Sequence, residues 1–386
     1  MLATATETDH MHLQELHLTD FRSYATAEFQ PAASGITVVT GANGAGKTNL
    51  IEAVGYLATS RSLRGSPAEA MVRSGSPAGF AVVRSVVGHE ETGRRVTIDA
   101  ELHAAGRDRV RVNGQPLRRT RDLLGALQVT VFSPDDLELV KGGPAGRRSY
   151  LDDLLVAVSP RRDATLGELD RILKQRNALL KSSLSSWRPG RELPEDIRFT
   201  LEVWDAKLVQ VGEELARART RLVAALDPLV AEAYSALSEG SAYLEGRRHA
   251  SLSYRPSWSG PLADAVAAAR SDDLRRGVTT VGPHRDDLDL AIGDLPARTH
   301  ASQGEQRTLA LALRLAGHRL LAGEIGTAPV LLLDDVFSEL DRARSEALFH
   351  NLPAGQALLT TAGDLPAAAA GAVAARFRVE DGKLVA

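Results

Sequence analysis

The sequence contains no cysteine, and this absence excludes two kinds of site. None of the 386 residues is Cys, so neither a disulfide framework nor a thiolate metal site can form. Long apolar runs are missing too: no stretch reaches the roughly 18 residues that a membrane-spanning helix needs, and no charged-then-apolar signal peptide is found. We therefore expect a cytoplasmic protein with no membrane partner.

An excess of basic residues is absent as well. The chain has 46 Lys and Arg against 49 Asp and Glu, which gives a net charge of 46 − 49 = −3. The whole-chain charge therefore does not indicate a nucleic-acid-binding protein, and any basic surface must be local. Hydrophobic residues make up 44% of the chain, enough for a buried core in one large or two ordinary domains.

A glycine-rich segment is the most informative stretch that the chain does contain. Residues 41–48 match G-x-x-x-x-G-K-[ST] in full, after the apolar run 36–39 and before the helix-like residues 49–59. Strand, loop and helix in this order are typical of a P-loop, in which backbone N–H groups and a helix N-terminus surround phosphate oxygens. An ordinary glycine-rich turn is the alternative, and the flanking strand and helix disfavour it.

This P-loop predicts a set of nucleotide-binding residues. Lys47 is expected to reach the β- and γ-phosphates, and Thr48 to bind Mg²⁺. The predicted phosphate-binding residues are Gly41, Ala42, Asn43, Gly44, Ala45, Gly46, Lys47 and Thr48.

Arginine is concentrated shortly after the P-loop. Residues 61–121 carry 12 Arg and 6 Asp or Glu, a net charge of 12 − 6 = +6. Such a patch can neutralise the phosphates of a nucleic acid. The alternative is that strands within residues 95–112 alternate a solvated polar face with an apolar one. The candidate DNA contacts are Arg61, Arg64, Arg107, Arg109 and Arg111.

The middle of the chain has helical periodicity. A first seam is followed by a break rich in Ser, Pro and Gly at residues 182–190 and then by a second, longer seam. The strict 3,4 spacing predicts two helices that pack as an antiparallel hairpin, although amphipathic helices lying on a core would show the same pattern. The seams consist of Leu166, Leu169 and Leu173, and of Leu201, Trp204, Leu208, Val211, Leu215, Ala218, Leu222 and Ala225.

Two further motifs lie towards the C-terminus. Residues 330–335 are four apolar residues followed by Asp334 and Asp335, as expected for a buried parallel strand whose carboxyl end faces a ligand. We expect Asp334 to bind Mg²⁺ and Asp335 to position an attacking water, with Lys47 as the second catalytic residue. Upstream, Ser302 is placed at the N-cap of a long helix, and Gly304 would let the backbone approach another group closely.

These motifs carry a resemblance to a known family. The P-loop, Ser302-Gln-Gly-Glu-Gln306, residues 330–335 and Ser338-Glu-Leu-Asp341 follow the order of the parts of an ABC-type ATPase head. Residues 18–24, 132–137, 282–287 and 302–308 read LTDFRSY, FSPDDL, GPHRDD and SQGEQRT. On these strings the chain resembles the RecF family of bacterial recombination mediators, which are related to SMC heads, over nearly all of residues 11–386.

The resemblance implies an α/β fold, an ABC-type P-loop ATPase head with a helical insertion lobe. It divides the chain into four parts. Residues 1–10 are expected to be a disordered extension, with Met11 as a candidate natural start, and residues 11–149 to form the N-terminal part of the head. Arm-like helices at residues 150–275 would form the helical lobe, and residues 276–386 the C-terminal part of the head.

The resemblance also implies a function in recombinational repair and replication restart. The family binds ATP and DNA, single-stranded, gapped or duplex, and forms a homodimer on ATP. It acts with RecO and RecR in loading recombinase at gaps, supports the SOS response, and hydrolyses ATP weakly with stimulation by DNA. Ser302, Gln303, Gly304 and Gln306 would then bind the γ-phosphate on the partner subunit's Lys47, so that ATP joins the dimer.

Three positions depart from the ABC transporter ATPases. Asp335 stands where Glu is usual, Ser133-Pro134 where a Q-loop Gln is expected, and Thr360-Thr361 where a switch His is expected. An Asp reaches less far to a water than a Glu, so slow turnover is expected. The rival functions are a transporter subunit, which would need a membrane partner, an SMC-like structural head, which would need far longer arms, and a small-molecule P-loop kinase.

Overall fold

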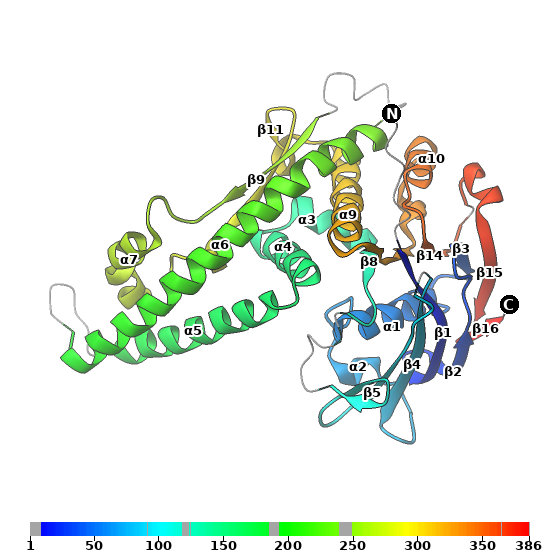
Figure 1. Cartoon of the computed structure of the whole chain (residues 1–386), viewed down its shortest axis with the longest axis horizontal. Coiled ribbons are helices and arrows are strands. Elements are labelled where there is room, and N and C mark those ends of the chain that lie inside the picture. The colour runs from blue at the N-terminus through cyan, green and yellow to red at the C-terminus, as the bar shows by residue number, and fades with distance from the viewer. Residues whose placement is uncertain are drawn as a thin grey trace. The chain divides into compact units, whose positions relative to one another are not determined.

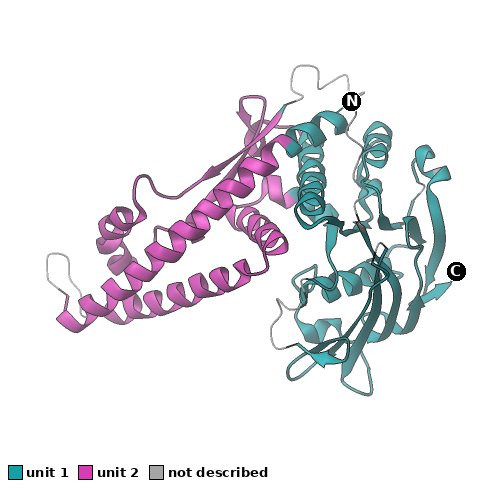
Figure 2. Cartoon of the chain, viewed as in Figure 1, with its two compact units in different colours: residues 1–137, 229–249, 303–386 teal, residues 138–228, 250–302 magenta. Residues whose placement is uncertain are grey.

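The computed structural model describes residues 9–90, 92–117, 123, 125–184, 193–238, 249–363 and 365–385. The chain forms two compact units (Figure 2). Unit 1 comprises Met1–Leu137, Leu229–His249 and Gln303–Ala386, and unit 2 comprises Glu138–Pro228 and Ala250–Ser302. No helix of the described residues combines the length and the apolar character needed to cross a membrane.

Unit 1 contains two sheets in its described part (Figure 1). One is mainly antiparallel, with strands in the order β12 (Thr327–Ala328), β1 (Asp9–Phe21), β4 (Phe80–His89), β5 (Arg95–His103), β6 (Arg109–Val112) and β7 (Gln115–Pro116), while β2 (Tyr24–Phe29) also pairs with β1. The other is mainly parallel, in the order β16 (Lys383–Val385), β15 (Val373–Glu380), β3 (Gly35–Thr40), β14 (Gln356–Thr361), β13 (Val330–Asp334) and β8 (Val129–Phe132).

Helix α1 (Lys47–Thr59) lies at the centre of unit 1 and contacts strands of both sheets. Leu50, Ile51, Val54 and Leu57 are buried in one core with residues of both sheets. The buried residues cover more than one face of the helix because both sides of α1 pack against a sheet. The predicted P-loop helix is therefore confirmed, and its N-terminus is fixed at the carboxyl end of β3.

The remaining helical segments of unit 1 flank this core. Ser133 and Asp136 form a capping box at the start of η2 (Pro134–Asp136), directly after β8. The short α3 (Leu137–Lys141) follows η2, and all of it except Leu137 belongs to unit 2. The other segments are α2 (Ala68–Met71), η2 (Pro134–Asp136), α9 (Gln303–Ile325), η5 (Val336–Glu339), α10 (Arg342–His350) and η6 (Ala367–Gly371).

Unit 2 is mainly helical. The 43-residue α6 (Glu195–Leu237) runs through it as far as Pro228. A small sheet of β9 (Ala250–Arg255), β10 (Asp287–Ile292) and β11 (Leu295–Pro296) accompanies the helices. The other helical segments are α4 (Pro144–Val158), α5 (Arg162–Ser183), α7 (Leu262–Arg276), η4 (Pro283–Arg285) and α8 (Ala297–His300).

Helices α5 and α6 form the predicted antiparallel hairpin (Figure 1). Arg162 near the start of α5 bonds Glu214, and Arg176 further along bonds Asp205, so the two helices run in opposite directions. The predicted α6 seam is buried from Leu201 to Leu222, apart from the half-buried Trp204, but its last member, Ala225, is exposed. Leu226 is buried instead, because a 3.6-residue helical period drifts away from a strict heptad.

The structure also differs from two expected boundaries. Residues 9 and 10 do not belong to a disordered extension, because they pair in parallel with Thr327 and Ala328 as the start of β1; residues 1–8 lie outside the described residues. Residues 276–302, expected in the head, cluster with the helical unit because β10 pairs with β9. Residues 138–149 also cluster there, whereas the end of α6 clusters with the head.

A fully buried arginine joins three helical elements of unit 2. Arg176 of α5 donates from Nε to Asp205 of α6 at 2.7 Å and from Nη1 to Asp273 of α7 at 2.7 Å. Thr279 accepts a further hydrogen bond from Nη1 at 2.8 Å. An ion this deep is tolerated only when several acceptors replace its hydration. The guanidinium therefore fixes where α5, α6 and α7 meet.

The string at residues 282–287 has a similar structural role. Arg147 binds both oxygens of Asp287 at 2.7 and 2.9 Å, and Arg219 donates to the Pro283 carbonyl at 2.8 Å. Burial lowers the pKa of His284 to about 4, so this imidazole is neutral near pH 7. Among the described residues, the side-chain contacts of this string place it in the core of unit 2.

Replacing Arg176 by Ala should strongly destabilise unit 2. The change leaves two buried carboxylates without their shared cation, which costs about 3–5 kcal/mol. Urea unfolding monitored by circular dichroism, with hydrogen exchange to locate the loss, measures the effect. Arg171→Ala is the matched control because Arg171 is an exposed residue of the same helix, and a loss in Arg176→Ala no larger than in this control would contradict the assignment.

Candidate functional site

The P-loop is shaped by two close backbone approaches. At Gly41, with φ 156°, a Cβ would lie 2.6 Å from the carbonyl oxygen of Val379. At Gly46, with φ 119°, it would lie 2.6 Å from Oγ of Ser23. Glycine adopts these φ values without strain, and it has no Cβ to collide with the neighbouring atoms. The loop between β3 and α1 is thus pressed against the segments that contain Ser23 and Val379.

Lys47 points back into its own loop. Its side chain is buried, and its Nζ donates to the carbonyls of Gly41 at 2.8 Å and Ala42 at 3.0 Å. The ammonium is therefore held at the centre of the loop by groups that a phosphate oxygen can replace. This is the position expected of a P-loop lysine.

Three side chains meet at the carboxyl ends of the parallel strands. The hydroxyls of Thr48, at 2.9 Å, and Thr360, at 2.7 Å, both donate to Oδ1 of Asp334. Burial raises the pKa of Asp334, while the bonds from Thr360 and Thr48 and the charge of Arg64 oppose that rise. The register explains the meeting, because Thr360 of β14 is paired with Asp334 of β13 on one side and with Val39 of β3 on the other.

Asp335 has an unusual backbone and an unsatisfied side chain. Its φ of 49° lies in the left-handed region, which is strained for a residue other than glycine. Its N–H donates to the Thr360 carbonyl at 3.1 Å, which holds this conformation. Within the part of the chain that the structure describes, its buried Oδ1 has no hydrogen-bond partner. A strained residue with a free carboxylate oxygen is typical of a functional site.

The oxygens around Asp334 suit a small hard cation. A Thr hydroxyl and one carboxylate are ligands that Mg²⁺ commonly uses together with phosphate oxygens and water. No group of three or more His, Cys, Asp or Glu side chains that could hold a metal occurs among the described residues. A cation here would therefore take the rest of its shell from water or phosphate oxygens.

The segment around Ser302 is only partly accessible. Helix α9 begins at Gln303, directly after Ser302, and both of these residues are exposed. Gln306, in contrast, has 5% of its surface exposed and lies inside unit 1. The exposed residues before and at the start of α9 are thus better placed for a ligand than Gln306.

Gly304 is closely approached by an arginine of its own chain. A Cβ at Gly304 would lie 2.6 to 2.9 Å from three guanidinium atoms of Arg344 in α10. Asp341 holds this guanidinium at 2.5 Å and also caps α10 by accepting from the Arg344 N–H at 2.9 Å. The close approach expected at Gly304 is therefore made by Arg344, a contact that no local sequence pattern indicates.

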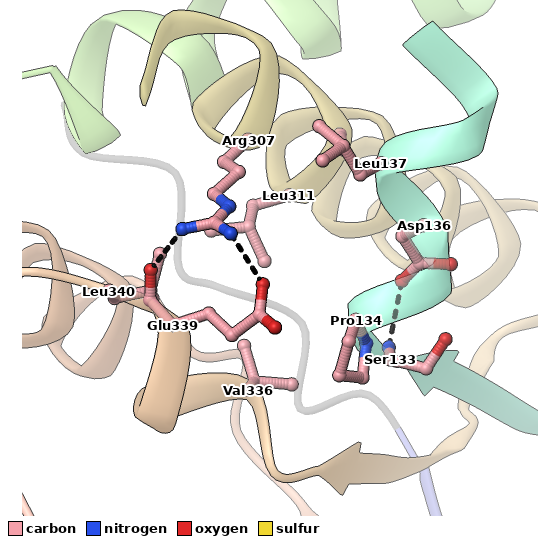
Figure 3. Close-up of a pocket in the computed structure, with 10 residues that line it drawn as sticks. Ser133, Pro134, Asp136, Leu137, Arg307, Leu311, Val336, Glu339 and Leu340 are labelled. Atoms are coloured by element: carbon pink, nitrogen blue, oxygen red, sulfur yellow. Dashed lines mark hydrogen bonds and ion pairs between the residues drawn. The ribbon is translucent and has the colours of Figure 1, made fainter. Parts of the chain in front are cut away.

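A second arginine joins α9 to the same segment after β13. Arg307 donates to the carbonyl of Glu339 at 2.7 Å and forms an ion pair with its carboxylate at 2.7 Å (Figure 3). This pair borders a small pocket of about 30 Å³ that Pro134, Leu311 and Val336 also line. Ser133 and Pro134, which stand where a Q-loop Gln is expected, thus line the same pocket as Arg307 near the start of α9.

The candidate DNA-binding arginines are exposed but differ in their surroundings. Arg61 and Arg64 follow α1, and the charge of Arg64 reaches Asp334. On β6, Arg109 and Arg111 lie 3.8 and 3.9 Å from Glu101. These two alternate with half-buried valines, as a solvated strand face would. Arg107 is exposed in the loop before β6, and residues 118, 119 and 121 lie outside the described residues.

Comparison with known proteins decides the family. The sequence model of the RecF/RecN/SMC N terminal domain matches residues 12–361. A DNA replication and repair protein RecF from Streptomyces avermitilis is 43% identical over 385 residues, which cover 96% of this chain and 99% of the relative. This chain belongs to the RecF family. It is a DNA replication and repair protein, as the resemblance predicted, and not a transporter subunit.

Solved structures agree with this family. The recombination mediator protein RecF-ATP of the RecFOR pathway superposes with a TM-score of 0.82 and 28% identity, over 98% of this chain and 99% of that one. The Smc head domain of Pyrococcus furiosus, at 18% identity and a TM-score of 0.55 over 97% of this chain and 96% of that one, shares the fold. The predicted ABC-type ATPase head fold is therefore confirmed for this RecF-family chain.

Sequence reasoning missed three residues near this site. Thr360 lies in the buried strand β14, so its position beside Asp334 follows once the order of the parallel strands is known. Arg344 gives no comparable signal. Asp381, in the turn between β15 and β16, lines a hollow beside the P-loop.

Replacing Gly304 by Ala should destabilise unit 1 by no more than about 1 kcal/mol, because the new methyl group displaces only the far end of the flexible Arg344 side chain from its ion pair with Asp341. The double variant Gly304→Ala with Arg344→Ala should recover most of this loss. Urea unfolding of the single and double variants gives the coupling energy. Gly323→Ala is the matched control, since a Cβ there meets nothing within 4 Å on the same helix. Additive losses in the double variant would refute the contact.

Proposed function

We propose that this RecF-family chain binds Mg-ATP at the P-loop, dimerises on ATP at DNA, and hydrolyses ATP slowly to release the dimer. The observation that best supports this proposal is the meeting of Thr48 and Thr360 on one oxygen of Asp334 beside a lysine held by its own loop. The naming of solved relatives as RecF-ATP and RecF-ATPrS also supports ATP as the ligand.

In this proposal the chain's own groups perform separate tasks. The ammonium of Lys47 exchanges the carbonyls of Gly41 and Ala42 for β- and γ-phosphate oxygens. Thr48 and Asp334 would hold Mg²⁺, which would supply positive charge beside the phosphates. Asp335 orients the attacking water through its free carboxylate oxygen. Its short side chain is the reason to expect weak ATPase activity. The expectation that DNA stimulates this activity comes from the resemblance to the RecF family.

Dimerisation would depend on the start of α9. Ser302 and Gln303 are exposed, and α9 is long enough to carry a full helix dipole at its N-terminus. An anion is stabilised at such an end by free N–H groups. We therefore place the γ-phosphate held by the partner subunit's Lys47 against Ser302, Gln303 and Gly304. The buried Gln306 supports this contact from inside rather than by touching ATP.

The DNA and protein partners follow from the family. We propose that the chain binds single-stranded or gapped DNA, and also duplex DNA at junctions, through the exposed arginines that follow α1 and lie on β6. RecO and RecR would then act with it to load recombinase, which supports the SOS response. A protein that works on bacterial chromosomal DNA is placed in the cytoplasm.

Lys47→Ala should weaken ATP binding at least about tenfold, a loss of roughly 1.4 kcal/mol or more, because it removes the mobile positive charge of the P-loop. Isothermal calorimetry measures the affinity. Lys47→Arg is the matched control because it keeps the charge in a different shape, and it should bind ATP while losing hydrolysis. Unchanged ATP affinity in Lys47→Ala would show that the P-loop does not bind ATP.

Ser302→Arg and Asp335→Asn should have opposite effects on the dimer. The arginine blocks the end of α9 that must meet the partner's nucleotide, so ATP still binds while dimerisation is lost. The asparagine removes the charge that orients water, so the dimer forms but persists at least about tenfold longer. Light scattering with ATP measures both variants. A Ser302→Arg protein that still dimerises on ATP, or an Asp335→Asn dimer of wild-type lifetime, would contradict the proposal that these residues link ATP hydrolysis to dimerisation.

The variant Arg107→Ala/Arg109→Ala/Arg111→Ala should bind DNA more weakly whatever the base sequence. Each lost phosphate contact lowers the salt slope of the affinity by about 0.7 to 0.9. Fluorescence anisotropy in the presence of ATP at several salt concentrations measures the slope, and Arg61→Ala/Arg64→Ala is tested in the same way. Arg275→Ala/Arg276→Ala on α7, also exposed, is the control. Wild-type DNA affinity and salt slope in these variants would show that the arginines form only a solvated face of the sheet and do not contact DNA.

A further inference from the structure

The C-terminal hairpin lies beside the P-loop because of strand order. Strand β15 pairs in parallel with β3, and Arg378 is opposite Thr40, the last residue before the P-loop. The chain turns at Asp381 and Gly382, both with positive φ, and returns as β16. Parallel strands end at the same edge of a sheet, so this turn and the P-loop leave the sheet on the same side.

Backbone contacts fix the hairpin against the site. The Val379 carbonyl occupies the space that a side chain at Gly41 would need, and a Cβ at Gly382 would lie 2.4 Å from the Ser23 carbonyl. Thr40 also donates its hydroxyl to the Phe377 carbonyl at 3.2 Å. These contacts involve short, rigid groups, so the turn cannot move independently of the P-loop.

A hollow of about 440 Å³ opens between the turn and the P-loop. Its lining consists of Ser23, Ala42, Asn43, Gly44, Ala45, Asp381 and Gly382. Asp381 carries the sole charge in this lining. The residue is exposed, and no hydrogen bond or ion pair of its carboxylate is found among the residues that the structure describes. An acceptor-only group thus faces an open space that adjoins a phosphate-binding loop.

The charge of Asp381 decides which part of a nucleotide can lie there. A carboxylate repels phosphates, and the phosphates already have the P-loop N–H groups and Lys47. The group covalently next to the phosphates is the ribose, whose hydroxyls donate hydrogen bonds. In dinucleotide-binding folds, carboxylates bind ribose hydroxyls in this way. The hollow therefore matches a ribose in charge and position.

We propose that the C-terminal hairpin forms the nucleoside wall of the ATP site and that Asp381 determines specificity by accepting a hydrogen bond from the ribose 2′-hydroxyl. This inference rests on the proposed ATP binding at the P-loop. It assigns to the last residues of the chain a role in selecting ribonucleotides, in addition to the pairing of β15 with β3.

Calorimetric binding of ATP, 2′-deoxy-ATP, GTP and inorganic triphosphate tests this role. Asp381→Ala should lose about tenfold in affinity for ATP and for GTP, since a hydrogen bond to a charged group is lost. Its affinities for ATP and 2′-deoxy-ATP should become equal, whereas binding of triphosphate should not change. Asp381→Asn, which keeps an acceptor without the charge, should lie between. Glu380→Gln is the matched control, because Glu380 is an exposed neighbour that pairs with Arg378 at 2.8 Å.

The outcomes separate this inference from the proposed function. If the wild-type protein binds neither ATP nor triphosphate, the proposed ATP site itself is wrong. If it binds both but Asp381→Ala keeps wild-type affinities and a wild-type ratio of ATP to 2′-deoxy-ATP, only the role of Asp381 is overturned. Equal losses for ATP and 2′-deoxy-ATP with GTP unchanged would assign the carboxylate to the adenine amino group and overturn the ribose contact. Thermal unfolding of each variant confirms that the hairpin remains folded.

Discussion

The site depends on the parallel order of β3, β14 and β13. This order places the P-loop, Thr360 and Asp334 at one edge of a sheet, although these segments lie about 300 residues apart in the chain. Two hydroxyls then converge on one carboxylate oxygen, and the backbone of Asp335 is held by Thr360. Without this register Lys47 would still lie in its loop, but Asp334 would not meet Thr48.

Close backbone contact is the second constraint on unit 1. Gly41 and Gly46 allow the P-loop to touch the segments of Val379 and Ser23, and Gly304 leaves room for Arg344. In each case the absence of a side chain brings together elements from distant parts of the sequence. The glycines of the motifs thus serve packing within the chain as well as the approach of a ligand.

Strings that identify a family need not contact a ligand. The residues at 282–287 helped to indicate the RecF family, yet Asp287 is bound by Arg147 and Pro283 by Arg219 inside unit 2. Together with Arg176, these arginines place fixed charges where an ordinary helical unit has apolar side chains. Buried ions tolerate few alternative arrangements, so they define how the helices of unit 2 pack.

The sequence by itself determined the local elements and most of the motifs. The P-loop, the strand ending in Asp334 and the helical seams all depend on neighbours within a few residues, whose spacing is readable along the chain. Only the tertiary structure decided that Thr360 bonds Asp334, that Arg344 fills the space at Gly304, that Gln306 is buried, and that Asp381 lies beside the P-loop. These contacts join distant segments through strand order and packing, which periodicity and local propensity do not encode.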